Sequence, residues 1–542
     1  MKILTALSAL LLAATAAVAQ PSDSARVAAV SRILSAQQDL SRLPQYNKEW
    51  NKFNYTSNPY SENSRYRKLG FMPHKSSLEV KSSPLGIGFE TLDRDTFDPR
   101  LTFGYLGETG VKYARCQTGW WKCERVKGKY DFAWLDEVVD SLAARGIETW
   151  FSVSFGHPDY TPCDFYEKQW EKARREGTIV PGKGRGWVSQ APYYYGEAAM
   201  KGWCDYVKAL AKHFKGRVHV WEIWNEPEGF WQENHVVAEK KYGAVQAARD
   251  FADFVHITSG VIKKVIPDAR VAFNLARTSS VWVPTLAKAG IAEDVDIFCY
   301  HNYSRMPELG LEAAIDQARA LFVRKDGTPL TIWQGESGRA SGPSHLYAFP
   351  SEYNQAKFIG RRIFFDLSCG AEMTSLFTVI DFQSYYPNGD DQYYGIWNAR
   401  ENRPKLGYYT LQNLAYIMDG IEPAPENFAQ FTTPGSSSTF TSLIPFNNVK
   451  VVSMKRGGVP VIAFWQMEHM DITAEPLRGT LKAVTDLPTP FVHPILIDPI
   501  RGTVTDITKA CPNLGTGEEK FAVWAYDYPL ILTDLSIFDE LL

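Results

Sequence analysis

Two glutamates, far apart in the chain, each stand at the end of a short apolar run. Glu226 closes residues 218–226, which a proline follows, and Glu336 closes residues 329–336. In a parallel barrel, a strand that ends in a carboxylate delivers this group to the face where barrel enzymes hold their active sites. A carboxyl that gives a proton and a carboxylate that stays ionised are the pair that cleaves a glycosidic bond. The two residues therefore predict a carbohydrate-cleaving site.

The two carboxyl groups of this site need opposite protonation states. Glu226 must hold a proton near neutral pH, which apolar neighbours and a nearby negative Glu336 favour. Glu336 must stay ionised as the nucleophile, so it needs a cation. Arg115, near the end of another apolar run, is the candidate for this cation. Tyr303 or Tyr300 would add a hydrogen bond to the nucleophile.

Five further side chains are candidates for contacts with a sugar. Asn225 is suited to hold the 2-hydroxyl group, a contact that strengthens in the transition state. His157 and His301 each follow a strand-like run, and Trp120 offers an aromatic face. Glu90 would contact the substrate or neutralise the arginine of the site. Each of them also has a structural reading, as a core aromatic, a satisfied histidine or a member of a buried ion pair.

Strand-like and helix-like patterns alternate between residues 85 and 420, which predicts a parallel sheet covered by helices. The strand-like runs are residues 85–90, 111–117, 147–155, 218–226, 270–274, 295–300, 330–335 and 373–380. Eight strands with intervening helices predict an α/β fold, a (β/α)8 TIM barrel. An open doubly wound sheet is the alternative. It would need a glycine-rich phosphate turn, and Gly86-x-Gly88 lacks the third glycine.

The segments on either side of the barrel have different patterns. Residues 421–542 hold short β-type runs separated by turn residues, which predicts an antiparallel β-sandwich domain. Residues 20–84 are polar and irregular, and we expect them to wrap the surface, with residues 66–84 adding a strand to the sandwich. An insertion at residues 159–192 follows the third barrel strand, and loops of this length are commonly functional.

Residues 1–19 have the features of a secretory signal peptide. Lys2 supplies the positive charge, an apolar stretch follows, and Ala17-Val18-Ala19 precedes Gln20 as a cleavage site. A membrane anchor is the alternative, but the run is short and no stop-transfer charges follow it. We find no later run of about 18 apolar residues, so we expect no membrane insertion. The sequence therefore predicts a secreted or periplasmic protein.

Composition indicates which kinds of ligand and which cysteine chemistry to expect. The net charge of −3 argues against nucleic acid as a partner, because no basic field would collect phosphates. The aromatic content of 13% leaves enough rings to line a sugar pocket after the core is filled. The seven cysteines match no zinc or redox spacing, and we expect mostly buried free thiols with one or two disulfides at most. The oligomeric state and any disulfide pairing stay open.

The segment around Glu226 resembles clan A of the retaining glycoside hydrolases, through Trp221-Glu222-Ile223-Trp224-Asn225-Glu226-Pro227 with Glu336 later in the chain. Residues around Arg115 resemble most closely family 39 of this clan, which includes β-xylosidases and α-L-iduronidases. These residues are Trp120, Glu124, Gly128, Tyr130-Asp131 and Leu135-Asp136. The order of barrel and sandwich is also similar to that of families 39, 30 and 51.

This resemblance implies roles for four residues of the chain. Glu226 would be the acid/base and Glu336 the nucleophile. Arg115 would correspond to the arginine of the second strand, and Tyr303 to the tyrosine of the sixth. The resemblance covers residues 85–420 and leaves the sugar open, because the clan acts on many sugars.

We therefore expect a secreted retaining β-glycosidase that acts from the end of oligosaccharides and needs no cofactor or metal. An endo-acting glycanase of the same clan is the first alternative. A catalytically dead barrel that only binds carbohydrate is the second. A metal-dependent hydrolase using His157, His219 or His301 is the third, but no H-x-H or H-E-x-x-H motif supports it.

Overall fold

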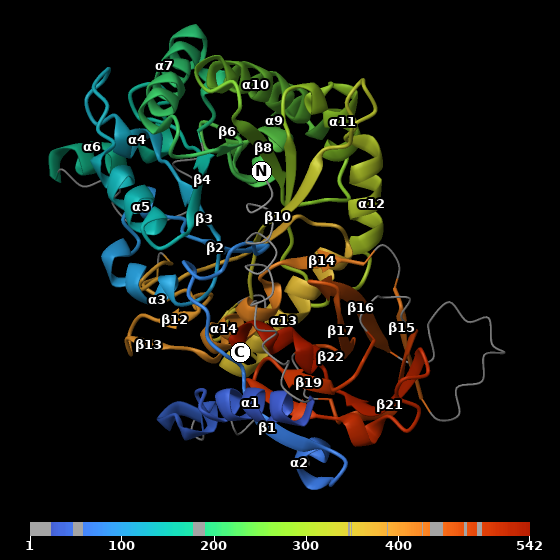
Figure 1. Ribbon diagram of the computed structural model, residues 1–542. Coiled ribbons are helices and arrows are strands. Elements are labelled where there is room, and N and C mark those ends of the chain that lie inside the picture. The colour runs from blue at the N-terminus through green and yellow to red at the C-terminus, as the bar shows by residue number, and fades with distance from the viewer. Residues whose placement is uncertain are drawn as a thin grey trace, which may run out of the picture.

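The chain folds into a parallel barrel followed by antiparallel sheets (Figure 1). The computed structural model describes residues 23–46, 58–176, 190–344, 347, 349–386, 388–424, 427–433, 448–470, 474–484 and 490–542. The predicted signal peptide lies outside the described residues, as does part of the insertion at residues 159–192. Among the described residues, no helix combines the length and the apolar character needed to cross a membrane.

Eight parallel strands close the barrel in the order β10-β11-β2-β3-β4-β5-β8-β9. Their bounds are β2 (Leu85–Gly88), β3 (Tyr113–Gln117), β4 (Glu148–Val153), β5 (Val220–Ile223), β8 (Arg270–Leu275), β9 (Ile297–His301), β10 (Thr331–Ser337) and β11 (Met373–Leu376). Each of them falls within or overlaps one predicted run, so the predicted (β/α)8 barrel is confirmed. The open doubly wound sheet is excluded, because β11, the last barrel strand of the chain, pairs with β2, the first, and so closes the ring.

Helices between the strands cover the outside of the barrel. The longer ones are α5 (Ala133–Ala143), α7 (Glu197–Phe214), α10 (Ala244–Val265), α11 (Trp282–Lys288), α12 (Leu311–Leu321), α13 (Glu352–Ser368) and α14 (Leu406–Met418). In α5 the buried residues are Leu135, Val138, Val139 and Leu142, the spacing of one helical face. The helix faces β4 with this stripe and so shields the strand from water.

The remaining α-helices and two small hairpins occupy the loops and the N-terminal segment. They are α1 (Asp23–Ser35), α2 (Pro59–Glu62), α3 (Phe103–Gly107), α4 (Trp120–Cys123), α6 (Glu167–Glu176), α8 (Pro227–Phe230), α9 (Ala238–Tyr242), and the hairpins of β6 (Gln232–Glu233) with β7 (Val236–Val237) and β12 (Trp397–Asn398) with β13 (Arg403–Pro404). Helices α4 and α8 follow barrel strands directly and so lie beside the face that holds the site.

The inside of the barrel is apolar at its base. The cluster there consists of Trp150, Val220, Ala272, Ile297, Cys299, Trp333 and Met373. Several of these residues are the first of their strands, so they fill the amino-terminal end of the barrel. The carboxyl ends of the strands are left for polar side chains.

Two antiparallel sheets follow the barrel. One has the order β1-β20-β19-β22-β17-β16-β14, and the other has the order β15-β18-β21. The strands are β1 (Arg67–Phe71), β14 (Ile421–Pro423), β15 (Ala429–Thr432), β16 (Val449–Arg456), β17 (Val459–Gln466), β18 (Leu477–Val484), β19 (Pro494–Asp498), β20 (Thr503–Asp506), β21 (Glu518–Ala525) and β22 (Leu530–Asp534). Phe431 of β15 stacks on Phe464 of β17, so aromatic side chains join the two sheets. The β-sandwich itself stays a prediction.

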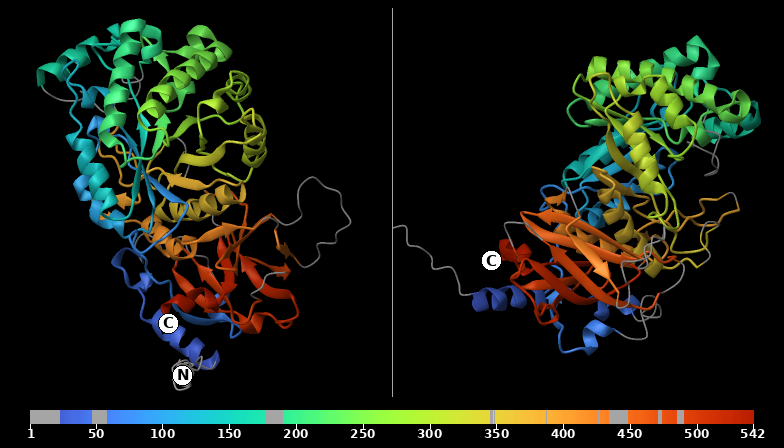
Figure 2. Two further views of the ribbon diagram at one scale, coloured as in Figure 1. Left: turned by 45° about the horizontal axis from the view of Figure 1, so that its top comes forward. Right: turned by 90° about the vertical axis from the view of Figure 1, so that its right-hand side faces the viewer.

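The N-terminal segment packs on the C-terminal sheets. Strand β1 pairs with β20 and forms the edge of the larger sheet. Figures 1 and 2 show the blue helices α1 and α2 beside the red C-terminal strands. The two ends of the described chain are therefore close together, although almost all of the sequence separates them.

Helix α13 connects the barrel to the larger sheet through buried charges. The ammonium of Lys357 donates to Asp527 at 2.8 Å, and both side chains are fully buried. Arg361, one turn later, donates twice to Glu308, which also accepts from the indole of Trp465. These pairs hold the two parts of the chain at a fixed distance because an unpaired charge here would be costly.

All seven cysteines are free, and six of them are buried. The prediction of mostly buried free thiols is confirmed, and the one or two disulfides allowed by it are not formed.

The Lys357–Asp527 pair generates a stability prediction. Lys357→Met takes the cation away from the buried Asp527 carboxylate, so the free energy of unfolding should fall by about 3–5 kcal/mol. The double variant Lys357→Met/Asp527→Leu should recover most of this loss, because no charge is then left buried. Urea denaturation followed by tryptophan fluorescence measures both effects. The control is Lys201→Met, which breaks an exposed pair with Asp205 and should cost less than about 1 kcal/mol. Equal costs for the two single variants would contradict the structural role of the buried pair.

Candidate active site

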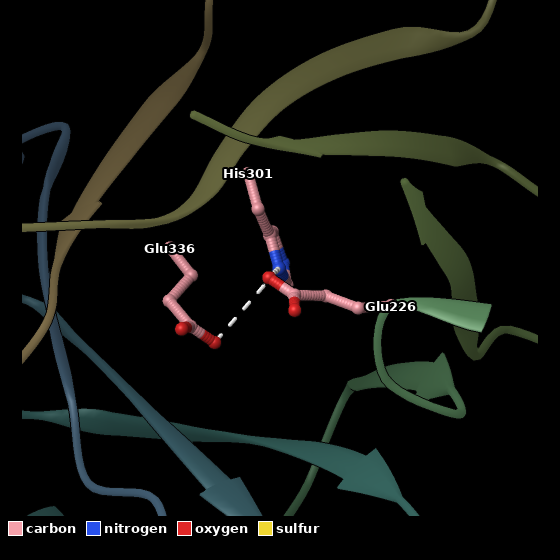
Figure 3. Close-up of side chains that lie close together, drawn as sticks. All are labelled: Glu226, His301 and Glu336. Carbon is pink, nitrogen blue, oxygen red and sulfur yellow. Dashed lines mark hydrogen bonds and ion pairs between the residues drawn. The ribbon is translucent and has the colours of Figure 1, made fainter. Parts of the chain in front are cut away.

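Glu226 and Glu336 face each other across the carboxyl end of the barrel. Glu226 follows β5, and Glu336 is the sixth residue of β10. One carboxylate oxygen of Glu226 lies within 4.8 Å of one oxygen of Glu336. Figure 3 shows both carboxyl groups pointing toward each other, with the ring of His301 beside them. Strands that are far apart in sequence thus deliver the two acids to one point.

The backbone at Glu226 has an unusual conformation. Its φ of 42° and ψ of 65° lie in the left-handed region, which a residue with a side chain seldom adopts. Its N–H donates to the Oδ1 atom of Asn274 at 2.6 Å, and its carbonyl accepts from Gly229 and Phe230 at 2.9 Å. Pro227 then starts α8, since proline suits the first position of a helix. The turn that ends β5 therefore aims the Glu226 side chain at the centre of the barrel.

Arg115 organises the carboxylates beneath the site. Its side chain is fully buried and donates to both oxygens of Glu222 at 2.8 Å. Its Nη1 atom donates to Glu336 at 2.6 Å and to Glu90 at 3.3 Å. Its Nη2 atom also donates to the side-chain oxygen of Asn225 at 2.8 Å. One guanidinium thus connects four strand ends, as planar bidentate donors of this type can.

Glu336 accepts hydrogen bonds on both of its oxygens. Arg115 donates to Oε2, and the hydroxyl of Tyr303 donates to Oε1, each at 2.6 Å. An ionised carboxylate is the form that accepts at both oxygens, and the adjacent guanidinium stabilises its charge. Burial and the charge of Glu336 raise the pKa of Tyr303 well above its ordinary value, so the phenol stays protonated as a donor.

His301 contacts the other glutamate. Its Nδ1 atom lies 3.0 Å from a carboxylate oxygen of Glu226 and 3.8 Å from one of Glu336. Burial, together with the positive charge of Arg115, lowers the pKa of His301 to about 4. The imidazole is therefore neutral at neutral pH, and it can share one hydrogen bond with Glu226 without adding a charge to the site.

Glu90 is the third acid at the cavity. Its side chain is buried, and burial with the nearby charge of Glu336 raises the pKa of Glu90 to about 8. The side chain accepts from Arg115, as one of the two roles considered from sequence requires. It also lines the cavity, and its contact with a substrate stays a prediction. A protonated carboxyl at this position can donate a hydrogen bond, which an ionised one cannot.

A cavity of about 290 Å³ opens directly above the two glutamates. Its wall combines acids, amides and aromatic rings, which is the composition of a small-ligand site. The lining residues are Glu90, Thr91, Arg94, Gln117, Phe155, Asn225, Glu226, Phe230, Ala276, Tyr303, Glu336, Phe377, Tyr385, Gln392 and Tyr394.

Three predicted sugar contacts are not among the residues that line the cavity. One of them, His301, lies beside it and contacts Glu226, and the other two lie farther away. Trp120 is fully buried, stacks on Tyr206 and donates from its indole to Glu124 at 2.6 Å. The Nε2 atom of His157 lies 2.7 Å from the carbonyl oxygen of Glu124. Neither lines the cavity, so the expectation that they contact sugar is corrected. Both follow strand ends, but the aromatic cluster beside α4 takes up their side chains.

The structure also decides the register of the sixth strand. Tyr300 is buried and donates to Asp366 at 2.7 Å, on the outer side of the barrel. His301 points inward, and Tyr303, in the loop after the strand, reaches Glu336. The alternation of a strand explains this, because neighbouring side chains point to opposite faces.

Sequence reasoning missed several residues of the site. Asn274 donates to Glu222 and to the carbonyl of Trp224, and so supports the turn at Glu226. Its place near the end of a predicted strand was the signal that could have found it. Tyr385 and Gln392, from the loop after β11, carried no such signal because loop residues show no periodicity.

Glu226, His301 and Glu336 have donor atoms within 4.8 Å of one another and so form a possible ligand set for a metal. The guanidinium of Arg115 is bonded to Glu336 at 2.6 Å and already supplies positive charge there. A divalent cation would be repelled by it. The trio therefore fits an acid–base site better than a metal centre.

Comparison with known proteins gives short matches in sequence and a long one in structure. The family model Glyco_hydro_42: Beta-galactosidase matches residues 100–247. A segment of 109 residues is 30% identical to the β-galactosidase BbgII of Bifidobacterium bifidum, over 20% of this chain and 15% of that protein. A segment of 65 residues is 41% identical to the β-galactosidase BgaA of Clostridium cellulovorans, over 12% of this chain and 9% of that protein. The chain thus spans only a small part of the length of these two relatives.

A family 39 glycoside hydrolase from the gut symbiont Bacteroides cellulosilyticus WH2 superposes with a TM-score of 0.58 and 16% identity. The match covers 83% of this chain and 80% of that one. This chain has the fold of a family 39 glycoside hydrolase. The resemblance stated from sequence is therefore confirmed at the level of fold, and it extends beyond the barrel, since the barrel alone is a smaller part of the chain.

The raised pKa of Glu90 predicts a pH-dependent effect on stability. The folded pKa is about 8, and an unfolded glutamate titrates near about 4.3. Between these values the folded protein keeps a proton that the unfolded chain releases, so this contribution to stability is lost as pH rises. Glu90→Gln removes the titration. The free energy of unfolding of the variant minus that of the unmodified protein should therefore rise by at least about 1.4 kcal/mol between pH 5 and pH 8.

Chemical denaturation at each pH measures this difference. The control is Glu137→Gln, an exposed residue paired with Arg100, which should show no rise across this window. A Glu90→Gln difference that is constant with pH would contradict a protonated Glu90.

Proposed function

We propose that this chain is a retaining glycoside hydrolase with Glu226 as acid/base and Glu336 as nucleophile. The observation that carries the proposal is the approach of the two carboxyl groups, whose oxygens come within 4.8 Å. Retaining enzymes hold these groups about 5–5.5 Å apart, whereas inverting enzymes leave about 6.5–9.5 Å for a water molecule. The short separation supports double displacement.

The surroundings of each acid support its role. Glu336 accepts from a guanidinium and from a phenol, which favours the ionised nucleophile. Glu226 faces the imidazole of His301, which is neutral at neutral pH. The ring therefore carries no positive charge that would favour the ionised form of Glu226. Asn225 lines the cavity and is fixed by Arg115, which suits a contact to the sugar 2-hydroxyl group.

The reaction takes two steps in this arrangement. Glu336 attacks the anomeric carbon while the glycosidic C–O bond breaks and Glu226 gives its proton to the leaving oxygen. Glu226, now ionised, takes a proton from water, which attacks the anomeric carbon and releases Glu336. Arg115 and Tyr303 hold the nucleophile in line throughout.

The size of the cavity supports action at the end of an oligosaccharide. A volume of about 290 Å³ equals about ten water molecules, which is the scale of one or two sugar rings and not of a long chain. An endo-acting glycanase is the alternative, and release of a monosaccharide from the first minutes of polysaccharide digestion would argue against it. The short matches to β-galactosidases make β-galactosides one substrate to test. The features of residues 1–19 support export from the cytoplasm.

The first test removes the nucleophile. Glu336→Gln should lower turnover of an activated aryl glycoside by at least about a thousandfold, because no covalent intermediate can form. Substrate binding should persist, since the amide keeps the shape of the side chain. The substrate is chosen from a panel of aryl xyloside, glucoside, galactoside, arabinoside and iduronide. The control is Glu372→Gln, an acid that pairs with Arg270 away from the cavity and should leave turnover within about threefold. Unchanged turnover in Glu336→Gln would remove the proposed nucleophile.

The second test follows the stereochemistry. Proton NMR of the first-formed product should show retention at the anomeric carbon, because two displacements restore the configuration. An inverted product would reject double displacement. A complete lack of turnover across the panel, with sugar binding intact, would favour a carbohydrate-binding barrel.

A further inference from the structure

Arg94 is the only cationic side chain among the described residues that line the cavity. It ends the 3₁₀ helix η4 (Leu92–Arg94), which follows the first barrel strand. Thr91 precedes the helix, and its φ of 69° in the left-handed region turns the chain sharply there. The side chain therefore belongs to the wall of the cavity and not to its floor, where Arg115 lies.

The position of this guanidinium is fixed from two sides. Its Nη2 atom donates to the side-chain oxygen of Gln117 at 2.8 Å, and the same oxygen accepts from the N–H of Thr91 at 3.2 Å. The guanidinium carbon lies 5.6 Å from the centre of the Phe155 ring. Gln117 and Phe155 also line the cavity, so Arg94 is held as part of one rigid wall.

The donors of Arg94 are not used up by the protein. A guanidinium has five N–H groups. Asp93 forms an ion pair with Nε at 3.3 Å, and this buried atom makes no hydrogen bond, so the donors that can serve a ligand are those of Nη1 and Nη2. Within the described part of the chain, Nη1 donates to no acceptor, and Gln117 takes only one bond from Nη2. Donors of a largely buried cation thus remain for a group inside the cavity.

Three acids line the cavity, Glu90, Glu226 and Glu336, but together they repel a negative ligand less than three free charges would. Glu90 is protonated at neutral pH because burial raises its pKa to about 8. In the proposed mechanism Glu226 holds a proton before the glycosidic bond breaks. The charge of Glu336 is offset by Arg115 at 2.6 Å. Asp93, which does not line the cavity, pairs with Nε of Arg94 at 3.3 Å, and burial raises its pKa. An anion bound at Arg94 would therefore meet one compensated carboxylate in the cavity and Asp93 behind the guanidinium.

From this wall we infer that the chain selects a sugar that bears an anionic substituent, which Arg94 binds through its free N–H groups. The inference rests on the proposed function, since it names the substrate class of the same site. A guanidinium pairs with planar and tetrahedral oxyanions through two parallel hydrogen bonds, so a uronic acid carboxylate and a sulfate ester share the required chemistry. Arg94 thereby sets specificity, and Glu226 and Glu336 do the bond cleavage.

The experiment measures binding without turnover, using matched phenyl 1-thio-β-glycosides that the enzyme cannot cleave. The pairs are glucuronide with glucoside and galacturonide with galactoside, and the third acid is galactoside 6-sulfate. At neutral pH and low salt, at least one acid should bind about tenfold or more tightly than its neutral partner. Tighter binding of a uronide would identify the anionic group as a carboxylate. Tighter binding of the sulfated galactoside would identify it as a sulfate ester.

Variants of Arg94 then assign the preference. In Arg94→Gln the dissociation constants of the acid and of its neutral partner should lie within about threefold of each other. Arg94→Lys should keep part of the preference for the acid, because it keeps the charge. The control is Arg100→Gln, a few residues along the chain from Arg94. It removes an exposed arginine paired with Glu137 and should leave the preference for the acid intact. Thermal unfolding checks that each variant is folded.

Failure of this inference and failure of the proposed function are distinguishable. Equal or tighter binding of the neutral partners, or an acid preference that survives in Arg94→Gln, overturns the role of Arg94 whatever the enzyme cleaves. Loss of turnover across the aryl O-glycoside panel would instead count against the proposed function and would leave an Arg94-dependent preference standing.

Discussion

The buried guanidinium of Arg115 is the interaction on which the site depends. A charge without a partner in the interior costs several kcal/mol, so a fully buried arginine must be surrounded by acceptors. The barrel meets this demand with Glu222 on one side and Glu336 on the other. These acids come from strands on different sides of the ring. The need to neutralise one cation therefore brings the ends of distant strands to a common centre.

The layer formed by Arg115 and its acids lies between the apolar base of the barrel and the cavity. Below it, Trp150 and the other residues of the apolar cluster fill the base of the barrel, and the Arg115 guanidinium lies 5.4 Å from the centre of the Trp150 ring. Above it, Glu336 has one oxygen bonded to Arg115 and the other to Tyr303. The nucleophile is thus fixed from both sides before a substrate arrives. Such a preorganised arrangement lowers the reorganisation needed in the transition state.

Burial distributes charge across the cavity in a way that residue types alone do not reveal. Glu90 and His301 are ionisable side chains that become neutral in opposite directions, the acid by keeping its proton and the imidazole by losing it. The loop after β2 then places Arg94 on the wall with donors to spare. The cavity consequently has a compensated floor and a cationic wall, although three acids line it.

Much of the fold could be predicted from sequence because hydrophobic periodicity is local. The eight barrel strands, the face of α5 and the change to antiparallel strands after residue 420 all follow from patterns within about ten residues. Glu226 and Glu336 could be singled out for the same reason, since each ends a strand, and a strand end in a barrel is a position in space. Trp120 and His157 also follow strand ends, yet their side chains enter an aromatic cluster, which no local pattern foretells.

The barrel, its two acids and the arginine beside them could therefore all be predicted before the structure was known. Only the tertiary structure decided which side chains share the cavity, that Tyr303 and not Tyr300 bonds to the nucleophile, and that Glu90 is neutral. Contacts across the barrel mouth and shifts of protonation arise from burial among segments that lie tens to hundreds of residues apart in the chain. Such burial exists only after the ring of strands has closed.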